Sequence, residues 1–339
     1  MNTTQLLLEL SALTGVSGRE GPAAQRLKEL LTPYGKVKTS PLGSIYATVR
    51  EPKEGGAHVL LAAHMDEIGL VVTYIEENGF LRVAPVGGVD RRVITASPVT
   101  IHTENGPVKG VVTSIPPHLQ KGDETDLPRV EDVFVDIGCD GAEAARRVCL
   151  GDRATIDAQP RELLGGLVSG KALDNRASCA CVLKALELLQ GEPLPCGLTV
   201  AFTTQEETGG VGAKTVAHLV NPTHAVALDV SFGHTPDAPR HKCGVLEGGP
   251  MIGIAPILDY RLSRKLEEIA KGENIPFQLE VMNGSTGTDA DSIAGTGRGI
   301  QTALISIPER YMHSPIEVLS PRDVDHTAQL LAAFLKEVR

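Results

Sequence analysis

The chain has 339 residues, which is more than one compact core usually needs, so two domains are expected. Hydrophobic residues make up 42% and charged residues 22% of the chain, as in ordinary soluble globular proteins. The formal net charge of -10, without any Lys/Arg-rich run, argues against nucleic acid and anionic membrane surfaces as partners.

The N-terminal segment and the cysteines bear on the compartment. The first residues lack a basic run, and Glu9 interrupts a short apolar stretch, so a signal peptide is not expected. No stretch approaches the ~20 apolar residues of a membrane span. The six cysteines form no CxxC pair, and a chain of this size does not depend on disulfides. We therefore expect a cytoplasmic protein with reduced thiols.

Two helices and two strands are expected at the start of the chain. The first helix is predicted to be capped by Thr3, and its apolar face consists of Leu6, Leu7, Leu10 and Leu13. A second apolar pattern, at Ala24, Leu27, Leu30 and Leu31, ends near Gly35. Residues 44–49 and 59–63 are typical of strands, and the second run is apolar enough to be buried on both faces.

From about residue 69 to residue 156 the pattern changes to short β-type runs separated by turns. Asn78-Gly79 and Asn105-Gly106 are strong hairpin signals. They predict pairing of 71–75 with 80–83 and of 99–102 with 108–112. The only clear helical stretch here is 141–147. This segment is therefore predicted to be a small all-β domain.

After Gly165 the sequence alternates between strands and helices. Strands are predicted at 198–203, 225–228, 277–281 and 302–307, and helices at 175–189 and 257–271. A last helix is expected to be capped by Ser320, with Pro321 in its first turn. This alternation predicts an α/β fold with a mainly parallel sheet flanked by helices. We expect one domain from 1–67 and 165–339, interrupted by a β-rich insert at 68–164.

Acids and histidines follow the predicted strands, where α/β sheets bind ligands. His64 and Asp66 follow the strand at 59–63, and Glu206 and Glu207 follow the strand at 198–203. The other candidates are Asp229 at a strand end, His313 in a loop after a strand, and Asp174 at a helix start. Each of them alone is more often a solvated or structural residue. Their convergence on one sheet edge favours a functional site.

Imidazole nitrogens and carboxylate oxygens suit two divalent ions, which need one bridging group when they lie ~3.5–4 Å apart. Two histidines, two aspartates and one glutamate would give each ion three ligands if one aspartate bridges. Asp66 shares the strand face of His64 and can orient its ring. Glu206 and Glu207 can both face the site only if the chain turns, which the following Gly209-Gly210 permits.

Other motifs are weaker. No HExxH or GxSxG motif occurs, which disfavours zincin and serine-hydrolase chemistry. The stretch 208–215 fails the phosphate-loop pattern because Ala213 stands where a glycine is needed. Cys179 and Cys181 fall within a helix, where small side chains pack well.

Together these residues resemble those of the tetrahedral metallo-aminopeptidases, a family that includes glutamyl aminopeptidases and endoglucanase-M-like proteins. The resemblance covers nearly the whole chain in order. The matching motifs are AHMDEIG at 63–69, LDNR at 173–176, QEETGGVGA at 205–213, ALD at 227–229, GTDA at 287–290 and YMHS at 311–314. The stretch 231–236, Ser-Phe-Gly-His-Thr-Pro, departs from the Gly-Asp-Thr-Pro of relatives at the edge of the pocket.

The resemblance implies a zinc-exopeptidase-like fold and assigns roles to the candidate residues. His64 and Asp229 would bind one ion, Glu207 and His313 the other, and Asp174 would bridge them. Glu206 would be the catalytic base and Asp66 would orient His64. The ions would be zinc or cobalt, with manganese as an alternative, because the ligand set suits all three.

The same resemblance implies partners. The substrates would be peptides, hydrolysed at the N-terminal bond with metal assistance. The insert would form dimers, and six dimers would build a tetrahedral dodecamer. The loop at 287–290 would line the substrate pocket, while the preferred N-terminal residue is left open.

Two rival functions stay open at the level of sequence. A cellulase-type glycosidase is disfavoured because such enzymes use metal-independent carboxylates and sugar-stacking aromatics. Here aromatic residues make up 3% of the chain and tryptophan is absent. A non-catalytic assembly protein of the same fold would be expected to lose ligands, yet all the candidate ligands and Glu206 are present.

Overall fold

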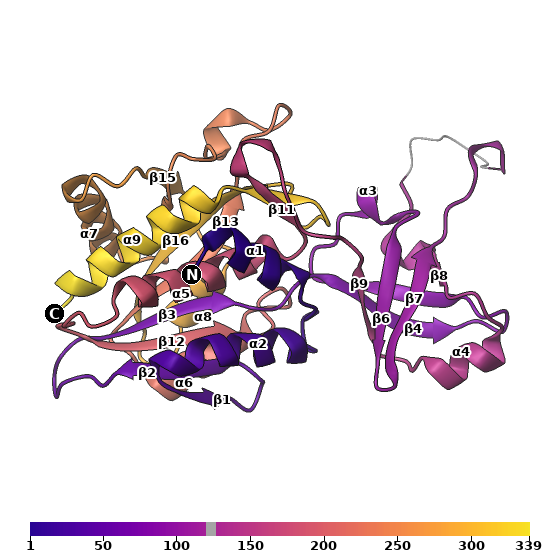
Figure 1. Ribbon diagram of the computed structural model, residues 1–339, viewed down its shortest axis with the longest axis horizontal. Helices are drawn as coiled ribbons and strands as arrows, with labels where there is room; N and C mark the ends of the chain where they lie inside the picture. The colour runs from indigo at the N-terminus through magenta and orange to yellow at the C-terminus, as the bar shows by residue number, and fades with distance from the viewer. Residues whose placement is uncertain (120–126) are drawn as a thin grey trace.

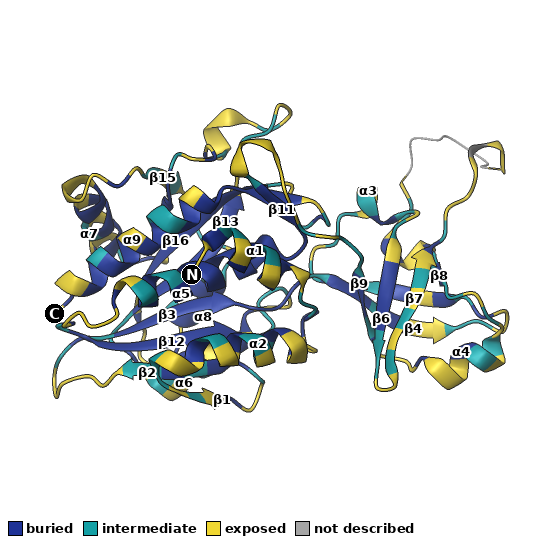
Figure 2. Cartoon of the chain, viewed as in Figure 1, coloured by how far each residue is buried: buried dark blue, intermediate teal, exposed yellow. Residues whose placement is uncertain are grey.

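The computed structural model describes residues 1–119 and 127–339. Figure 1 shows two bodies, a large one built on a sheet with helices and a smaller β-rich one beside it. The strands at the centre of both bodies are buried (Figure 2). No helix in these two stretches is long and apolar enough to cross a membrane.

The large body contains an 11-stranded sheet within the described residues. Its main path runs β1-β2-β12-β3-β13-β16-β17-β11-β10, and β14 pairs with β16 and β15. The strands are β1 (Lys36–Thr39), β2 (Ile45–Arg50), β3 (His58–His64), β10 (Arg161–Glu162), β11 (Val168–Gly170), β12 (Gly197–Thr203), β13 (His224–Phe232), β14 (Met251–Ile254), β15 (Gln278–Val281), β16 (Gln301–Arg310) and β17 (Glu317–Leu319).

The sheet is mixed, whereas the sequence predicts a mainly parallel one. Its centre, β12-β3-β13-β16, is parallel as expected. Both ends are antiparallel, from β1 to β12 on one side and from β16 to β10 on the other. The strand–helix alternation reports only crossover connections, and short antiparallel strands need none. The prediction therefore includes the strand β2 but not its antiparallel pairing, and it lacks the short strands β1, β10, β11 and β17.

Helices cover both faces of the sheet, as predicted. One face carries α1 (Thr3–Ala12), α2 (Gly21–Leu31), α5 (Leu173–Leu188), α7 (Tyr260–Gly272) and α9 (Pro321–Glu337), and the other carries α6 (Val211–Val220) and α8 (Asp289–Ala294). Alternate residues of β3 supply the two cores: Val59 and Leu61 belong to the first, Leu60 and Ala62 to the second. An apolar strand is therefore required here, because neither face meets water.

The helix caps agree in part with the sequence. Ser320 caps α9, and its side chain accepts a hydrogen bond from the Arg322 N–H. The cap of α1 is Asn2 and not Thr3, because the Asn2 side chain accepts from the Gln5 N–H. Asp259 caps α7, so this helix begins after the predicted residue 257.

The smaller body is a closed antiparallel barrel in the order β4-β5-β8-β7-β6-β9. Its elements are β4 (Gly69–Ile75), β5 (Leu81–Val86), α3 (Arg91–Ile94), β6 (Pro98–Thr103), β7 (Gly106–Val112), β8 (Phe134–Asp136), α4 (Gly141–Arg147) and β9 (Arg153–Ile156). Both predicted hairpins are present, as β4-β5 and β6-β7, and the barrel has a core of its own. Closure removes the exposed strand edges that an isolated small sheet would leave.

Candidate metal centre and active site

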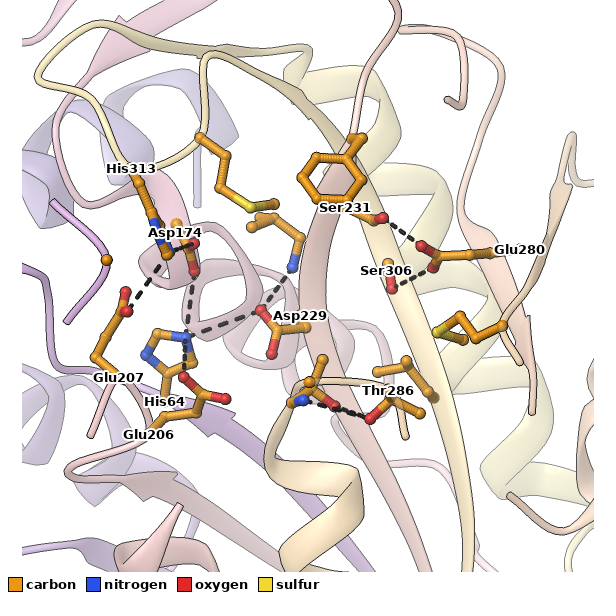
Figure 3. A pocket seen from close by; sticks show the side chains of 18 residues that line it. His64, Asp174, Glu206, Glu207, Asp229, Ser231, Glu280, Thr286, Ser306 and His313 are labelled. Carbon is orange, nitrogen blue, oxygen red and sulfur yellow. Dashed lines mark hydrogen bonds and ion pairs between the residues drawn. The ribbon is translucent and has the colours of Figure 1, made fainter. Parts of the chain in front are cut away.

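The parallel centre of the sheet brings the predicted site residues to one edge. His64 is the last residue of β3 and pairs in register with Thr203, the last residue of β12. Glu206 and Glu207 follow β12, and Asp229 lies in the neighbouring β13. Asp174 comes from the first turn of α5, and His313 from the loop after β16. Figure 3 shows these side chains pointing toward one another.

Asp174 lies between the two histidines. Its Oδ1 is 3.2 Å from His64 Nε2, and its Oδ2 is 3.3 Å from His313 Nε2. Each oxygen of this buried carboxylate therefore faces a different imidazole nitrogen. This is the arrangement that a carboxylate needs to bridge two ions.

The other carboxylates divide between the two histidines. Glu207 Oε2 lies 3.4 Å from His313 Nε2. Asp229 Oδ1 and Glu206 Oε2 lie 3.8 Å and 3.9 Å from His64 Nε2. Ligand atoms of His64, Asp174 and Glu207 all lie within 4.8 Å of one another. The spacing leaves room for cations among these groups.

Asp66 has a second set of contacts that the sequence did not suggest. Its Oδ1 is 3.5 Å from Nδ1 of His64, the ring that Asp66 is predicted to orient. The same carboxylate also accepts hydrogen bonds from the backbone N–H groups of Glu206, at 3.1 Å, and Glu207, at 3.2 Å. Asp66 thus ties the end of β3 to the turn that presents both glutamates. The positive φ of Gln205 and Gly209 produces this turn, as the glycines suggested.

Negative charge dominates the cluster. Burial alone would lower the pKa of His64, but hydrogen bonds to Asp174 and Asp66 and the nearby carboxylates raise it well above its usual value. Burial, reinforced by Asp174, raises the pKa of both Glu207 and Asp229 well above the normal range. Among the described residues that line this site there is no lysine or arginine. A set of nitrogen and oxygen donors with unbalanced negative charge fits divalent cations.

Three comparisons identify the family. The family model described as M42 glutamyl aminopeptidase matches residues 43–330. The chain is 37% identical over 334 residues to a putative aminopeptidase of Acetivibrio thermocellus, with 96% of each chain covered. It is 32% identical to the lysyl aminopeptidase of Pyrococcus furiosus, with 99% of this chain and 97% of that protein covered. The TET1 peptidase of Pyrococcus horikoshii, which can assemble into a tetrahedron or a large octahedral shell, superposes with a TM-score of 0.88 at 30% identity, covering 99% and 100% of the two chains.

The chain belongs to the M42 glutamyl aminopeptidase family. The predicted family and the predicted class of enzyme, a metal-dependent peptidase of the aminopeptidase type, are therefore confirmed.

The centre of this M42 protein opens into a cavity of about 470 Å³. His64, Asp174, Glu206, Glu207, Asp229 and His313 line one side (Figure 3). The loop predicted to line the pocket does so at Gly287 and Thr288, and the divergent stretch contributes Ser231 and Phe232. Phe232 is the one Phe, Tyr or Trp among the described lining residues, which leaves little surface for stacking a sugar.

Some residues around the M42 centre were not found from the sequence. Glu317 Oε2 accepts from the backbone N–H groups of Leu173, at 2.7 Å, and Asp174, at 3.2 Å, and so holds the start of α5. It lies outside the quoted motifs, and nothing in its local pattern indicates this contact.

The barrel also reaches the centre, through Gly87 and Gly88. A Cβ atom at Gly88 would lie 2.5 Å from His313 Nδ1, and one at Gly87 would lie 3.1 Å from Glu207 Oε2. Only residues without side chains fit this close approach. A pair of glycines after a strand could have signalled it.

Proposed function

We propose that this M42 protein is a two-metal aminopeptidase that removes N-terminal residues from peptides. The observation that carries the proposal is Asp174, whose two oxygens face His64 and His313 separately. An isolated zinc site would need no such shared carboxylate.

The proposed ligand set follows these contacts. His64 and Asp229 would hold one ion, Glu207 and His313 the other, and Asp174 both. Zinc or cobalt suits this mixture of imidazole and carboxylate, and manganese is the alternative. When bound, the two ions supply Lewis-acid activation of water and of the peptide carbonyl.

Glu206 is proposed as the general base. Its carboxylate lines the cavity beside the proposed ligands, with Oε2 3.9 Å from His64 Nε2, and so can reach a water bound there. It would take the proton of the attacking water and pass it to the leaving amine. Asp66 would hold the His64 ring and, through its two backbone contacts, the turn that carries Glu206.

The acidic ligands of the centre would also confine cleavage to the N-terminus. A free α-amino group is a cation, and the carboxylates around the centre favour it. An acylated terminus has lost that charge. This protein is therefore expected to require a free N-terminus.

We also propose that the two bodies have different roles, one in catalysis and the other in assembly. Residues 1–67 and 165–339 would form the catalytic domain, with a zinc-exopeptidase-like fold, and 68–164 a dimerisation domain, except that β10 (Arg161–Glu162) pairs with β11 in the large sheet. Exposed apolar side chains at Val111, Leu119 and Leu127 lie in the barrel segment and support a contact there. The relative that forms a tetrahedron supports a tetrahedral dodecamer of dimers. A cytoplasmic location, without nucleic-acid or membrane partners, completes the proposal.

The assembly is tested by replacing residues 69–163 with a short linker. Light scattering should then show only small species, and a variant that still assembles at native size would contradict the role of the insert. Size is the appropriate measurement, because the deletion also removes Gly87 and Gly88 from the site.

The enzymatic function is tested with aminoacyl-p-nitroanilides. Chelation should abolish hydrolysis. Zinc, cobalt and manganese are then added separately to find which of them restores activity, and the bound metal is measured in parallel. The matched control is the N-acetylated form of the same anilide, which should not be cleaved. Full activity in a metal-free preparation would rule out the proposal.

A further inference from the structure

Glu280 places a carboxylate in the cavity, across from the metal-binding side chains (Figure 3). It lies on β15 and is partly buried. Its Oε1 accepts a hydrogen bond from Ser231 Oγ, and its Oε2 accepts one from Ser306 Oγ at 3.0 Å. Both serines hold the carboxylate without neutralising it, since a hydroxyl carries no charge.

The two serines connect Glu280 to the centre through neighbouring strands. Ser306 of β16 is in register with Asp229 of β13. Ser231 lies two residues beyond Asp229 on the same strand, so both side chains lie on one face of the sheet. One strip of polar side chains therefore runs from a proposed metal ligand to Glu280. A substrate bound at the metals would extend along it.

Four apolar side chains also line the cavity, from Phe232, Met282, Leu304 and Met312. Burial raises the pKa of Glu280, although the serine hydrogen bonds lower it. No lysine or arginine lines the cavity within the described residues. Apart from the proposed metal ligands and Glu206, the described lining residues thus include one carboxylate, Glu280, which lies among apolar side chains and has no cationic partner.

We propose that Glu280 is the specificity-determining residue of the pocket and pairs with the side-chain cation of an N-terminal lysine or arginine. The inference rests on the proposed aminopeptidase function. A lysine has a four-carbon stem and a terminal ammonium, which match apolar walls followed by a carboxylate. The family is described as glutamyl aminopeptidase, whereas the relative from Pyrococcus furiosus is a lysyl aminopeptidase. These names imply side chains of opposite charge, so the preference of this protein has to come from its own pocket.

A structural role of Glu280 can be separated from recognition of charge. Glu280→Gln keeps the size and can still form hydrogen bonds with both serines, but it removes the negative charge. Norleucine is an uncharged analogue of lysine with a similar stem. The ratio of kcat/KM for lysyl- and norleucyl-p-nitroanilide therefore measures recognition of the cation.

The wild-type, metal-loaded protein should prefer the lysyl over the norleucyl anilide by roughly 10- to 100-fold, as expected for a hydrogen bond to a charged group. The arginyl anilide is measured alongside. In Glu280→Gln the preference should fall to near one, with norleucine cleavage retained. Glu280→Lys should shift the preference toward the glutamyl anilide. Glu273→Gln, an exposed glutamate after α7, is the matched control and should keep the wild-type ratio.

The outcomes distinguish the two proposals. If the wild type cleaves norleucyl and lysyl anilides equally well, the role of Glu280 is wrong and the aminopeptidase function stands. If Glu280→Gln loses norleucine cleavage as fully as lysine cleavage, Glu280 is structural and the inference fails. If no aminoacyl anilide is cleaved by the metal-loaded protein, the proposed function fails and the inference with it.

Discussion

Two buried ionic clusters meet at the end of β3 and differ in their balance of charge. In the first, Glu67 is fully paired: its Oε2 accepts from Lys171 Nζ at 2.7 Å, and its Oε1 accepts from Arg176 at 3.0 Å and from the Gly15 N–H at 2.8 Å. In the second, three residues earlier, His64 is surrounded by carboxylates that have no lysine or arginine among the described lining residues.

The pKa values of two glutamates express this difference. Burial raises the pKa of both Glu67 and Glu207. For Glu67, Lys171 and Arg176 overcome burial, and the pKa ends below its ordinary value. For Glu207, Asp174 adds to burial, and the pKa rises well above it. Burial of charge alone therefore does not separate the two clusters, whereas the presence or absence of a balancing lysine or arginine does.

The largest effect is expected from Asp174→Asn. The substitution keeps the size of the side chain but removes the charge shared by the two histidine sites, so both ions should be lost and hydrolysis abolished. Metal analysis and activity on an aminoacyl anilide check this. Asp132→Asn, on the exposed barrel surface, should leave both unchanged. Retention of both ions by Asp174→Asn would contradict the bridging role.

The next effect separates Glu206 from Glu207. Glu206→Gln should keep both ions and lower turnover roughly 10²- to 10⁴-fold, because a general base is lost. Glu207→Gln should weaken one ion, and added metal should partly restore activity. Metal content and turnover are measured for both variants side by side. The reverse pattern would exchange the two roles.

Glu67→Gln should affect folding and not chemistry. It leaves Lys171 and Arg176 buried without their counter-charge, which costs about 3–5 kcal/mol of unfolding free energy. Denaturant unfolding of the metal-free protein measures the loss. If stability is unchanged but metal binding disappears, the two clusters are not distinct in the way that their charges suggest.

The smallest effect is expected at Glu143 of α4. This carboxylate is paired with Arg146 and Arg147, but all three side chains are at the surface, where water and salt screen the interaction. Glu143→Gln should leave the unfolding midpoint unchanged within error. A destabilisation as large as that of Glu67→Gln would show that pairing matters more than burial.

The sequence was sufficient where a pattern repeats over several residues. The apolar run that precedes His64 can only be a buried strand, and the parallel register then brings His64 near the residues after β12. Short strands such as β10 and β17 have no such repeat and were not predicted for this reason, whereas β2 was predicted as a strand.

Contacts between distant segments could not be read from local patterns either. Glu317 holds the backbone of Asp174 across 143 positions of chain, and Asp66 binds the backbone of Glu206 across 140. Glu280 shows the same limit, since its partners Ser231 and Ser306 come from two other strands. Only the folded chain brings these groups together, and the residues next to them in the sequence do not indicate these contacts.

The close approach of Gly87 and Gly88 to Glu207 and His313 has an evolutionary consequence. The barrel looks like a module that could be exchanged between relatives without disturbing catalysis, yet its loop forms part of the wall of the centre. A barrel grafted from a homologue with any side chain at position 88 would displace His313. The loop of the barrel and the residues of the centre that it touches are therefore expected to change together, although they lie in different bodies.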